Sequence, residues 1–221
     1  MKKNAAILMC IILGAACVTG CAQNNEVFTE KRYSADAGEI TEICIDVRDR
    51  QIDVAPSADN QIHINYFDTD KEYHNISVTD GHTLSMTTES NKDWTDYIGG
   101  KLPASSRKIL LQLPDSPITA LKLSTTNEDI STPSLANIDN LSLASNGGNL
   151  IFDNLEVGNT ICLDSKNGDI RGTIIGSYDE YAISCNIKKG ESNLPPCKED
   201  GAKNLTVSNN NGNIEIKFTG K

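Results

Sequence analysis

Four oxygen-bearing side chains recur at matching places in the second half of the sequence: Asp129, Asn149, Asp169 and Asn213. If these positions stack, their oxygens form a ladder, and hard cations such as Ca²⁺ take roughly six to eight oxygen ligands. Asp and Asn also bond to their own backbone at chain corners, so corner chemistry explains the same residues without an ion. The glycine-rich nonapeptide of calcium-binding β-rolls is absent. We therefore predict no metal or other cofactor, with calcium as an open alternative.

The histidines form no recognisable metal or catalytic motif. No two of His63, His74 and His82 stand at metal-ligand spacing on one element, and the HExxH, GxSxG and phosphate-loop motifs are absent. His63 alternates with Ile62 and Ile64, which places it on the opposite, solvent-facing side of a strand. We predict surface positions for all three histidines and no catalytic residue.

Acidic residues are abundant but dispersed. Polysaccharide lyases and hydrolases need paired carboxylates, or a carboxylate beside a basic proton acceptor, projecting from one sheet. The nearest approximations are Asp46, Asp49 and Asp53 near one strand, and Asp93 with Asp96 around Trp94. A solvated acidic surface explains both groups. We predict that the protein is not an enzyme, and a β-helix polysaccharide-active enzyme is the alternative.

The cysteines permit disulfides but leave the pairing open. Cys10 and Cys17 lie in an N-terminal leader, and the chain beyond Cys21 contains Cys44, Cys162, Cys185 and Cys197. An even number in an exported protein permits disulfides without requiring them. Cys185 and Cys197 bracket an irregular segment and form a possible disulfide. Cys185 also aligns with Leu163, which favours a small buried side chain instead.

Residues 1–20 have the layout of a bacterial export signal. Lys2 and Lys3 precede an apolar run from Ala5 to Ala16, and small residues then lead to Gly20-Cys21. This junction resembles a lipobox, in which the Cys21 sulfur receives a diacylglycerol and the leader is cut before it. We predict an exported, lipid-anchored lipoprotein on the extracytoplasmic face of a membrane, with a flexible tether over residues 21–37 and one domain over residues 38–221.

A repeat of twenty residues governs the second half. Leu121-Lys-Leu123, Leu141-Ser-Leu143 and Ile161-Cys-Leu163 align without gaps, each followed by a polar corner and a second alternating strand. A fourth copy begins at Leu205, and a degenerate copy begins at Ile183. This periodicity is typical of a solenoid, in which each unit covers the apolar face of its neighbour. The alternative is an antiparallel meander of hairpins.

Glycines mark the corners of these copies. Gly147, Gly168 and Gly212 each follow an asparagine, and such pairs adopt positive φ cheaply. We predict that they are structural turns. The first half also alternates, with Asp80-Gly81 turning one strand into the next, and no window has a sustained helical period.

These features resemble the DUF4097 family of candidate bacterial adhesins. The resemblance rests on the Cys21 lipobox, Ile52-Asp-Val54-Ala-Pro56, Leu111-Gln-Leu113-Pro114 and the repeated Asn-Gly-Asp/Asn-Ile corner, and it covers roughly residues 38–218. It implies an all-β, right-handed β-solenoid on a secreted or anchored envelope protein. The chain departs from the pattern at Lys189-Gly190-Glu191 and the following Pro195-Pro196.

Composition excludes one large class of function. The 221 residues contain 30 acidic against 20 basic side chains, a net charge of −10, and only 5% are aromatic. A phosphate backbone needs a basic face, so we predict no nucleic-acid partner. We predict a non-enzymatic, adhesin-like surface module that binds membrane lipid through acylated Cys21 and a glycan or envelope protein through its solenoid. The alternative within binding proteins is an accessory or sensor subunit of an envelope-stress system.

Overall fold

Alternating apolar residues build most of the strands that the structure describes. The computed structural model describes residues 27–94 and 103–220. In the strand Glu42–Asp46, Ile43 and Ile45 are buried while their neighbours point outward, and the same alternation runs through the later strands. The all-β solenoid predicted from the sequence is confirmed. Within the described residues, no helix is long and apolar enough to cross a membrane.

The strands and short 3₁₀ turns follow one another along the chain. The first half contains β1 (Thr29–Asp36), β2 (Glu42–Asp46), β3 (Gln51–Pro56), β4 (Gln61–Asp68), β5 (Glu72–Thr79), β6 (Thr83–Ser90), η2 (Ala104–Arg107) and β7 (Lys108–Leu113). The second half contains β8 (Ile118–Thr125), β9 (Ile130–Thr132), β10 (Leu135–Ser145), β11 (Leu150–Asn167), β12 (Ile170–Ile174), η3 (Tyr178–Glu180), β13 (Tyr181–Lys189), β14 (Cys197–Lys198), β15 (Lys203–Asn211) and β16 (Ile214–Phe218).

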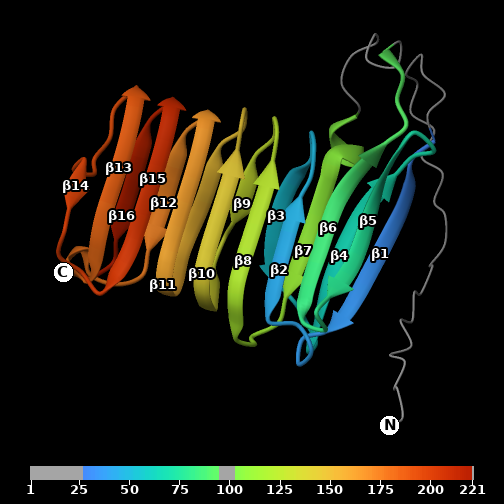
Figure 1. Ribbon diagram of the computed structural model, residues 1–221, viewed down its shortest axis with the longest axis horizontal. Helices are drawn as coiled ribbons and strands as arrows, with labels where there is room; N and C mark the ends of the chain where they lie inside the picture. Colours follow the sequence, from blue (N-terminus) through green and yellow to red (C-terminus); the bar gives the residue numbers. More distant parts are fainter. Residues whose placement is uncertain (1–26, 95–102, 221) are drawn as a thin grey trace.

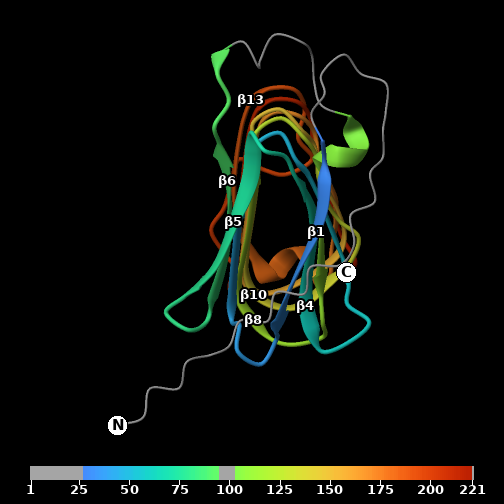
Figure 2. The same cartoon turned by 90° about the vertical axis from the view of Figure 1, so that its right-hand side faces the viewer.

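One continuous ladder of hydrogen bonds folds back on itself into two walls (Figures 1 and 2). Wall A has the order β5, β6, β2, β8, β10, second half of β11, β15, β13. Wall B has the order β1, β4, β7, β3, β9, first half of β11, β12, β16. The long strand β11 joins the walls because it contributes one half to each.

The twenty-residue period is the rise from one rung to the next. On wall A, Leu121 pairs with Leu141 and Leu141 with Ile161, all in parallel register. On wall B, Ile130 pairs with Leu150 and Leu150 with Ile170. The solenoid is therefore confirmed over the antiparallel meander, because successive copies return to the same corner.

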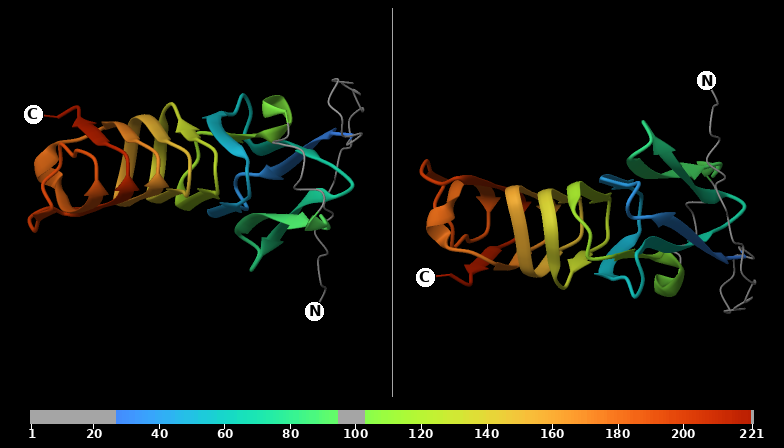
Figure 3. Two further views of the ribbon diagram at one scale, coloured as in Figure 1. Left: turned by 90° about the horizontal axis from the view of Figure 1, so that it is seen from above. Right: turned by 90° about the horizontal axis from the view of Figure 1, so that it is seen from below.

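The rung order departs from the chain order at both ends of the stack (Figure 3). The rung of β15 and β16 packs directly on the rung of β11 and β12, and β13 lies outside it. The rung of β6 and β7 likewise lies outside that of β2 and β3. Ile161 and its partner Leu205 are forty-four residues apart because the chain first forms β13 in the outermost rung and then returns to form β15 between β13 and β11.

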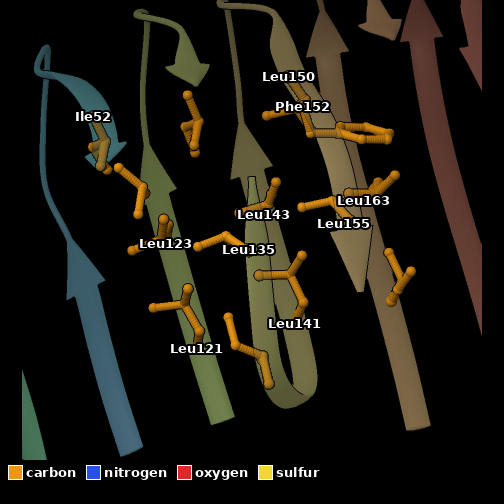
Figure 4. Close-up of a cluster of buried hydrophobic side chains, with 14 of the residues drawn as sticks. Ile52, Leu121, Leu123, Leu135, Leu141, Leu143, Leu150, Phe152, Leu155 and Leu163 are labelled. Carbon is orange, nitrogen blue, oxygen red and sulfur yellow. The ribbon is translucent and has the colours of Figure 1, made fainter. Parts of the chain in front are cut away.

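Columns of aliphatic side chains fill the space between the walls (Figure 4). Leu123, Leu143 and Leu163 form one column on wall A, and all three are fully buried. On wall B, Phe152 pairs with Gly172. A Cβ on Gly172 would lie 2.3 Å from the Phe152 ring, so the glycine leaves the space that the ring fills. Each buried Leu or Ile contributes roughly 1.5–3 kcal/mol relative to an exposed one, so these columns supply most of the cohesion between rungs.

Antiparallel strands cover the N-terminal end of the stack. β1 pairs with β4 over its whole length, and β4 pairs with β7. The predicted flexible tether is therefore wrong for residues 29–36, because Tyr33 is buried in the core and anchors this segment as an edge strand. The predicted turn is confirmed: Asp80 (φ 53°) and Gly81 (φ 79°) join β5 to β6 in an antiparallel hairpin.

A buried ion network ties this end to the first rung. Arg50, only 1% exposed, contacts Glu72 Oε1 through Nη2, and its Nη1 donates to the backbone carbonyls of Arg48 and Asp49 at 3.4 and 3.3 Å. Lys92 contacts the other carboxylate oxygen of Glu72. The network joins the corner after β2 to the start of β5.

Candidate functional site

The outward face of wall A is a regular surface built from strands in continuous register. Its central row crosses seven strands in register, and nearly all of its side chains are small: Ser85, Cys44, Lys122, Ser142, Cys162, Thr206 and Ser184. The rows on either side have the same character, for example Ala120, Asn140, Thr160 and Asn204. Small side chains on a parallel sheet leave an even plane, with strands about 4.8 Å apart.

The plane offers hydroxyl and amide groups with few charges. In these three rows the charged side chains are Glu42, Lys122, Asp46 and Asp164, and hydroxyl or amide groups stand between them on most strands. Lys166 and Lys188 lie beyond these rows, near the ends of β11 and β13. Such groups donate and accept hydrogen bonds at a fixed spacing. The arrangement can therefore receive an extended polar ligand along the stack of rungs.

The four recurring side chains Asp129, Asn149, Asp169 and Asn213 stack as expected, and each contacts the next rung. Asn149 N–H donates to Asp129 Oδ1 at 2.7 Å, Asp169 N–H to Asn149 Oδ1 at 2.9 Å, and Asn213 N–H to Asp169 Oδ1 at 2.9 Å. Asn213 in turn accepts from Glu191 N–H at 3.0 Å. The Oδ1 atoms thus bind backbone donors at the corner, which is the structural role that corner chemistry gives them. Among the described residues, no group of three or more His, Cys, Asp and Glu side chains is arranged to hold a metal.

A second ladder, which the sequence analysis missed, lies inside the same corner. Thr125, Ser145, Ser165 and Asn209 are buried, and each donates to a corner carbonyl of a neighbouring rung. Ser145 Oγ, for example, donates to Glu128 O at 3.0 Å and accepts from Gly148 N–H at 2.9 Å. The recurrence of one short polar residue just before each corner is the signal that could have revealed it.

The corner glycines are required for a different reason than predicted. Gly212 has a positive φ of 141°, but Gly147 and Gly168 do not, so the positive-φ explanation is wrong for these two. A Cβ on Gly168 would lie 2.2 Å from Gly148 O, and one on Gly148 would lie 2.0 Å from Glu128 O. The main chains of successive rungs approach too closely at this column for any side chain. At Gly147 the nearest atom is the Asn127 side-chain oxygen, at 2.9 Å.

The possible disulfide between Cys185 and Cys197 is not formed. Both residues are free thiols, with Cys185 buried and Cys197 exposed. The register pairs Cys197 with Ser184, which precedes Cys185, so the two thiols project from opposite faces of the sheet. Cys185 Sγ instead lies 3.4 Å from Ser192 Oγ.

The acidic groups that the enzyme alternative needs are not brought together. Asp46 lies on wall A, Asp53 lies on wall B beside Lys108, and Asp49 is in the corner between them, where its Oδ1 accepts from Asn127 at 2.6 Å. Trp94 is 75% exposed, while Asp96 lies outside the described residues, as do the leader and Cys21.

The histidine prediction is wrong for two of three residues. His82 is exposed as predicted, but His63 and His74 are buried. His74 Nδ1 lies 2.8 Å from Asp68 Oδ1, and Lys31 Nζ lies 2.8 Å from Asp68 Oδ2. His63 lies between Ser34 and Asp59. His63 lies on the outward face of β4, but it is buried between Ser34 of β1 and Asp59, which alternation alone could not show.

Because of Asp68, we expect the stability of the protein to fall as the pH is lowered into the acid range. Burial raises its pKa, but hydrogen bonds and charge from His74 and Lys31 outweigh burial, so the pKa of Asp68 is lowered in the fold. A lowered folded pKa stabilises the protein above the unfolded value of about 3.9, and this contribution is lost as pH falls through the folded pKa. We expect Asp68→Asn to lower stability at pH 7 and to flatten the loss of stability in acid. Urea unfolding from pH 7 to pH 3 measures this; parallel curves for the two proteins would contradict it.

Comparisons with known proteins agree with the geometry. Residues 40–220 match the family model DUF4097, described as Toastrack. A crystal structure of a candidate cell adhesion protein from Clostridium sporogenes superposes with a TM-score of 0.63 at 12% identity, covering 87% of this chain and 100% of that chain. This likeness shows the fold. A candidate adhesin from Bacteroides fragilis covers 90% of this chain at 13% identity with a TM-score of 0.32, over 100% of its own length. A comparison with curated proteins finds no match.

Proposed function

Because the chain belongs to the Toastrack DUF4097 family, we propose that it is a lipid-anchored binding module of the cell envelope. The observation that carries the proposal is the plane of small polar side chains on wall A. A glycan chain is the ligand class that fits this plane best, since it presents hydroxyl groups at regular intervals and can lie flat along the rungs. The Clostridium sporogenes neighbour, described as a candidate cell adhesion protein, supports this class of function.

The anchor in this proposal is acylated Cys21. Each buried methylene adds on the order of 0.8 kcal/mol, so two or three acyl chains hold the protein firmly on the membrane. We expect mass spectrometry of the mature protein to find an N-terminus at Cys21 that carries a diacylglycerol, with Cys44 unmodified in the same sample. A lipid-free mature protein that begins at another residue would rule the anchor out.

The binding function is tested with residues 22–221 immobilised through the N-terminus. Envelope material, separated into a glycan pool and a membrane-protein pool, is passed over the protein, and we expect the glycan pool to be retained. Thr206→Lys places a long charged side chain in the central row of wall A and should reduce retention at least tenfold. Ser131→Lys adds the same charge to wall B and serves as the matched control.

Three outcomes separate the candidate functions. Glycan retention that Thr206→Lys abolishes and Ser131→Lys preserves supports the proposal. Stoichiometric enrichment of one membrane protein supports the accessory or sensor subunit of an envelope-stress system and overturns glycan binding. Equal retention by both variants would show that wall A is not the binding face.

A further inference from the structure

Three polar side chains at the N-terminal end of wall B form a connected relay. Ser34 Oγ lies 2.7 Å from His63 Nδ1, and His63 Nε2 lies 2.9 Å from Asp59 Oδ1. We propose that Ser34 is a nucleophile, activated by His63 and oriented through Asp59, which attacks the carbonyl carbon of carboxylic esters. This goes beyond the binding function proposed above and involves the opposite wall.

The chemistry of the three groups fixes the direction of the relay. An ionised carboxylate only accepts hydrogen bonds, so a neutral His63 must place its proton on Nε2, facing Asp59. Nδ1 then carries the lone pair, and the Ser34 hydroxyl must donate to it. This is the arrangement that a general base needs to remove a proton from a serine, with a carboxylate holding the imidazole in the correct tautomer.

Asp59 is held as an acceptor by further contacts. Its Oδ1 accepts from the Gln61 N–H at 3.0 Å and from Ser57 Oγ at 3.0 Å, as well as from His63. Desolvation raises its pKa, but these hydrogen bonds outweigh it and lower the pKa of Asp59. The carboxylate is therefore ionised at neutral pH and available to orient the imidazole.

Burial differs among the three residues as the proposal requires. The His63 side chain is only 6% exposed, whereas Ser34 is exposed and Asp59 is 55% exposed. The imidazole is shielded from water, whereas Ser34 lies at the exposed surface of β1. The geometry is rigid, because Ser34 and His63 are direct cross-strand partners in β1 and β4, and Ser57 N–H bonds to Leu113 O at 2.7 Å to fix the loop before Asp59.

An exposed cation lies on the same face of β1. Arg32 is two residues from Ser34, so both side chains point outward from the strand, about 7 Å apart along it. Its guanidinium can donate hydrogen bonds to an oxyanion that develops on a carbonyl attacked by Ser34. This places a basic group where negative charge forms.

The proposed reaction is balanced by the groups present and a water molecule. Ser34 Oγ bonds to the ester carbon while its proton passes to His63 Nδ1, and the departing alcohol takes that proton as its bond to carbon breaks. Water then attacks the acyl-serine, gives one proton to His63 Nδ1, and releases the carboxylic acid as the proton returns to Ser34 Oγ. No metal, oxidant or cofactor takes part in these steps.

A fluorophosphonate probe tests the nucleophile directly, because Ser34 Oγ displaces fluoride and remains covalently labelled. We expect intact-mass spectrometry of residues 22–221 to show one adduct, peptide mapping to place it on Ser34, and p-nitrophenyl acetate to be hydrolysed. Ser34→Ala should lose the adduct, while Ser77→Ala, which changes an exposed serine on β5, should keep it.

The orienting role of Asp59 is tested by Asp59→Asn. This substitution is at an exposed side chain, so the fold should survive it, and the new amide can donate to Nε2 and reverse the tautomer. We expect the maximal labelling rate to fall about 10²-fold or more with little change in probe affinity. Asp70→Asn, on the exposed turn after β4, is the matched control.

Any of three results would overturn the proposal: no adduct on the folded wild-type protein, an adduct that persists in Ser34→Ala, or wild-type labelling of folded Asp59→Asn. A merely structural Ser34–His63 hydrogen bond would give the first result. Glycan retention by wall A is measured separately, so failure of either proposal leaves the other standing.

Discussion

Gly168→Ala should destabilise the protein by about 3 kcal/mol, because the new Cβ would lie 2.2 Å from Gly148 O and force two rungs apart. The carbonyl of Gly148 also accepts from Ser165 Oγ, so it cannot move aside without weakening the inner polar ladder. Chemical denaturation followed by circular dichroism measures the effect as a lower urea midpoint at unchanged slope.

Gly38→Ala is the control for Gly168→Ala. The nearest atom to a Cβ at this position is Asp36 Oδ1 at 3.4 Å, an ordinary contact with a movable side chain. We expect its stability to stay within about 0.5 kcal/mol of wild type. Equal midpoints for the two variants would contradict close rung contact as the reason for the corner glycines.

Glu72→Gln should cost about 3–5 kcal/mol, since it leaves the guanidinium of Arg50 buried without a counter-charge. Lys92 would lose its partner at the same time. Thermal unfolding and urea titration both report the loss, and we expect the N-terminal end of the stack to become sensitive to proteolysis first.

The exposed pair of Lys217 and Glu215 is the control for this prediction. Their side chains are 71% and 61% exposed and lie 3.0 Å apart. Water screens such a pair, so Glu215→Gln should change stability by about 0.5 kcal/mol or less. A Glu72→Gln protein as stable as this control would show that Arg50 finds another partner on substitution.

Much of the architecture could be predicted from periodicity. The twenty-residue spacing predicted the registers from Leu121 to Leu141 and from Leu141 to Ile161, because a solenoid must bring equivalent residues to one column. The alternation of Ile43 with Ile45 predicted which side chains are buried. Asp80-Gly81 predicted a hairpin turn, because both residues adopt positive φ readily.

The neighbours of each strand could not be predicted in the same way. Nothing in the degenerate copy at Ile183 indicates that it lies outside the copy at Leu205. Likewise, the sequence did not indicate that residues 29–36 form an edge strand against β4. Periodicity identifies equivalent positions, but the order of equivalent rungs depends on long-range contacts that have no local signature.

The polar sites were harder to predict than the core. The stacking of Asp129, Asn149, Asp169 and Asn213 followed from the repeat, yet their backbone donors depend on a register accurate to one residue. His63 looked solvent-facing because its neighbours Ile62 and Ile64 are apolar. It is buried because Ser34 and Asp59 cover it, and these residues come from a partner strand and a loop.

The exchanged order of the last two rungs has a consequence for how the chain matures. β13 pairs with β15 along its length and otherwise only with the two residues of β14. Most of its backbone hydrogen bonds to a neighbouring strand therefore form only after β15 has folded. During synthesis or export, residues 181–199 can therefore dock onto the solenoid only after residues 203–211 have emerged and paired. A protein truncated before Lys203 would lose two layers rather than one, and its newly open end would expose Ile161 and Leu163 together with the backbone groups that normally bind β15.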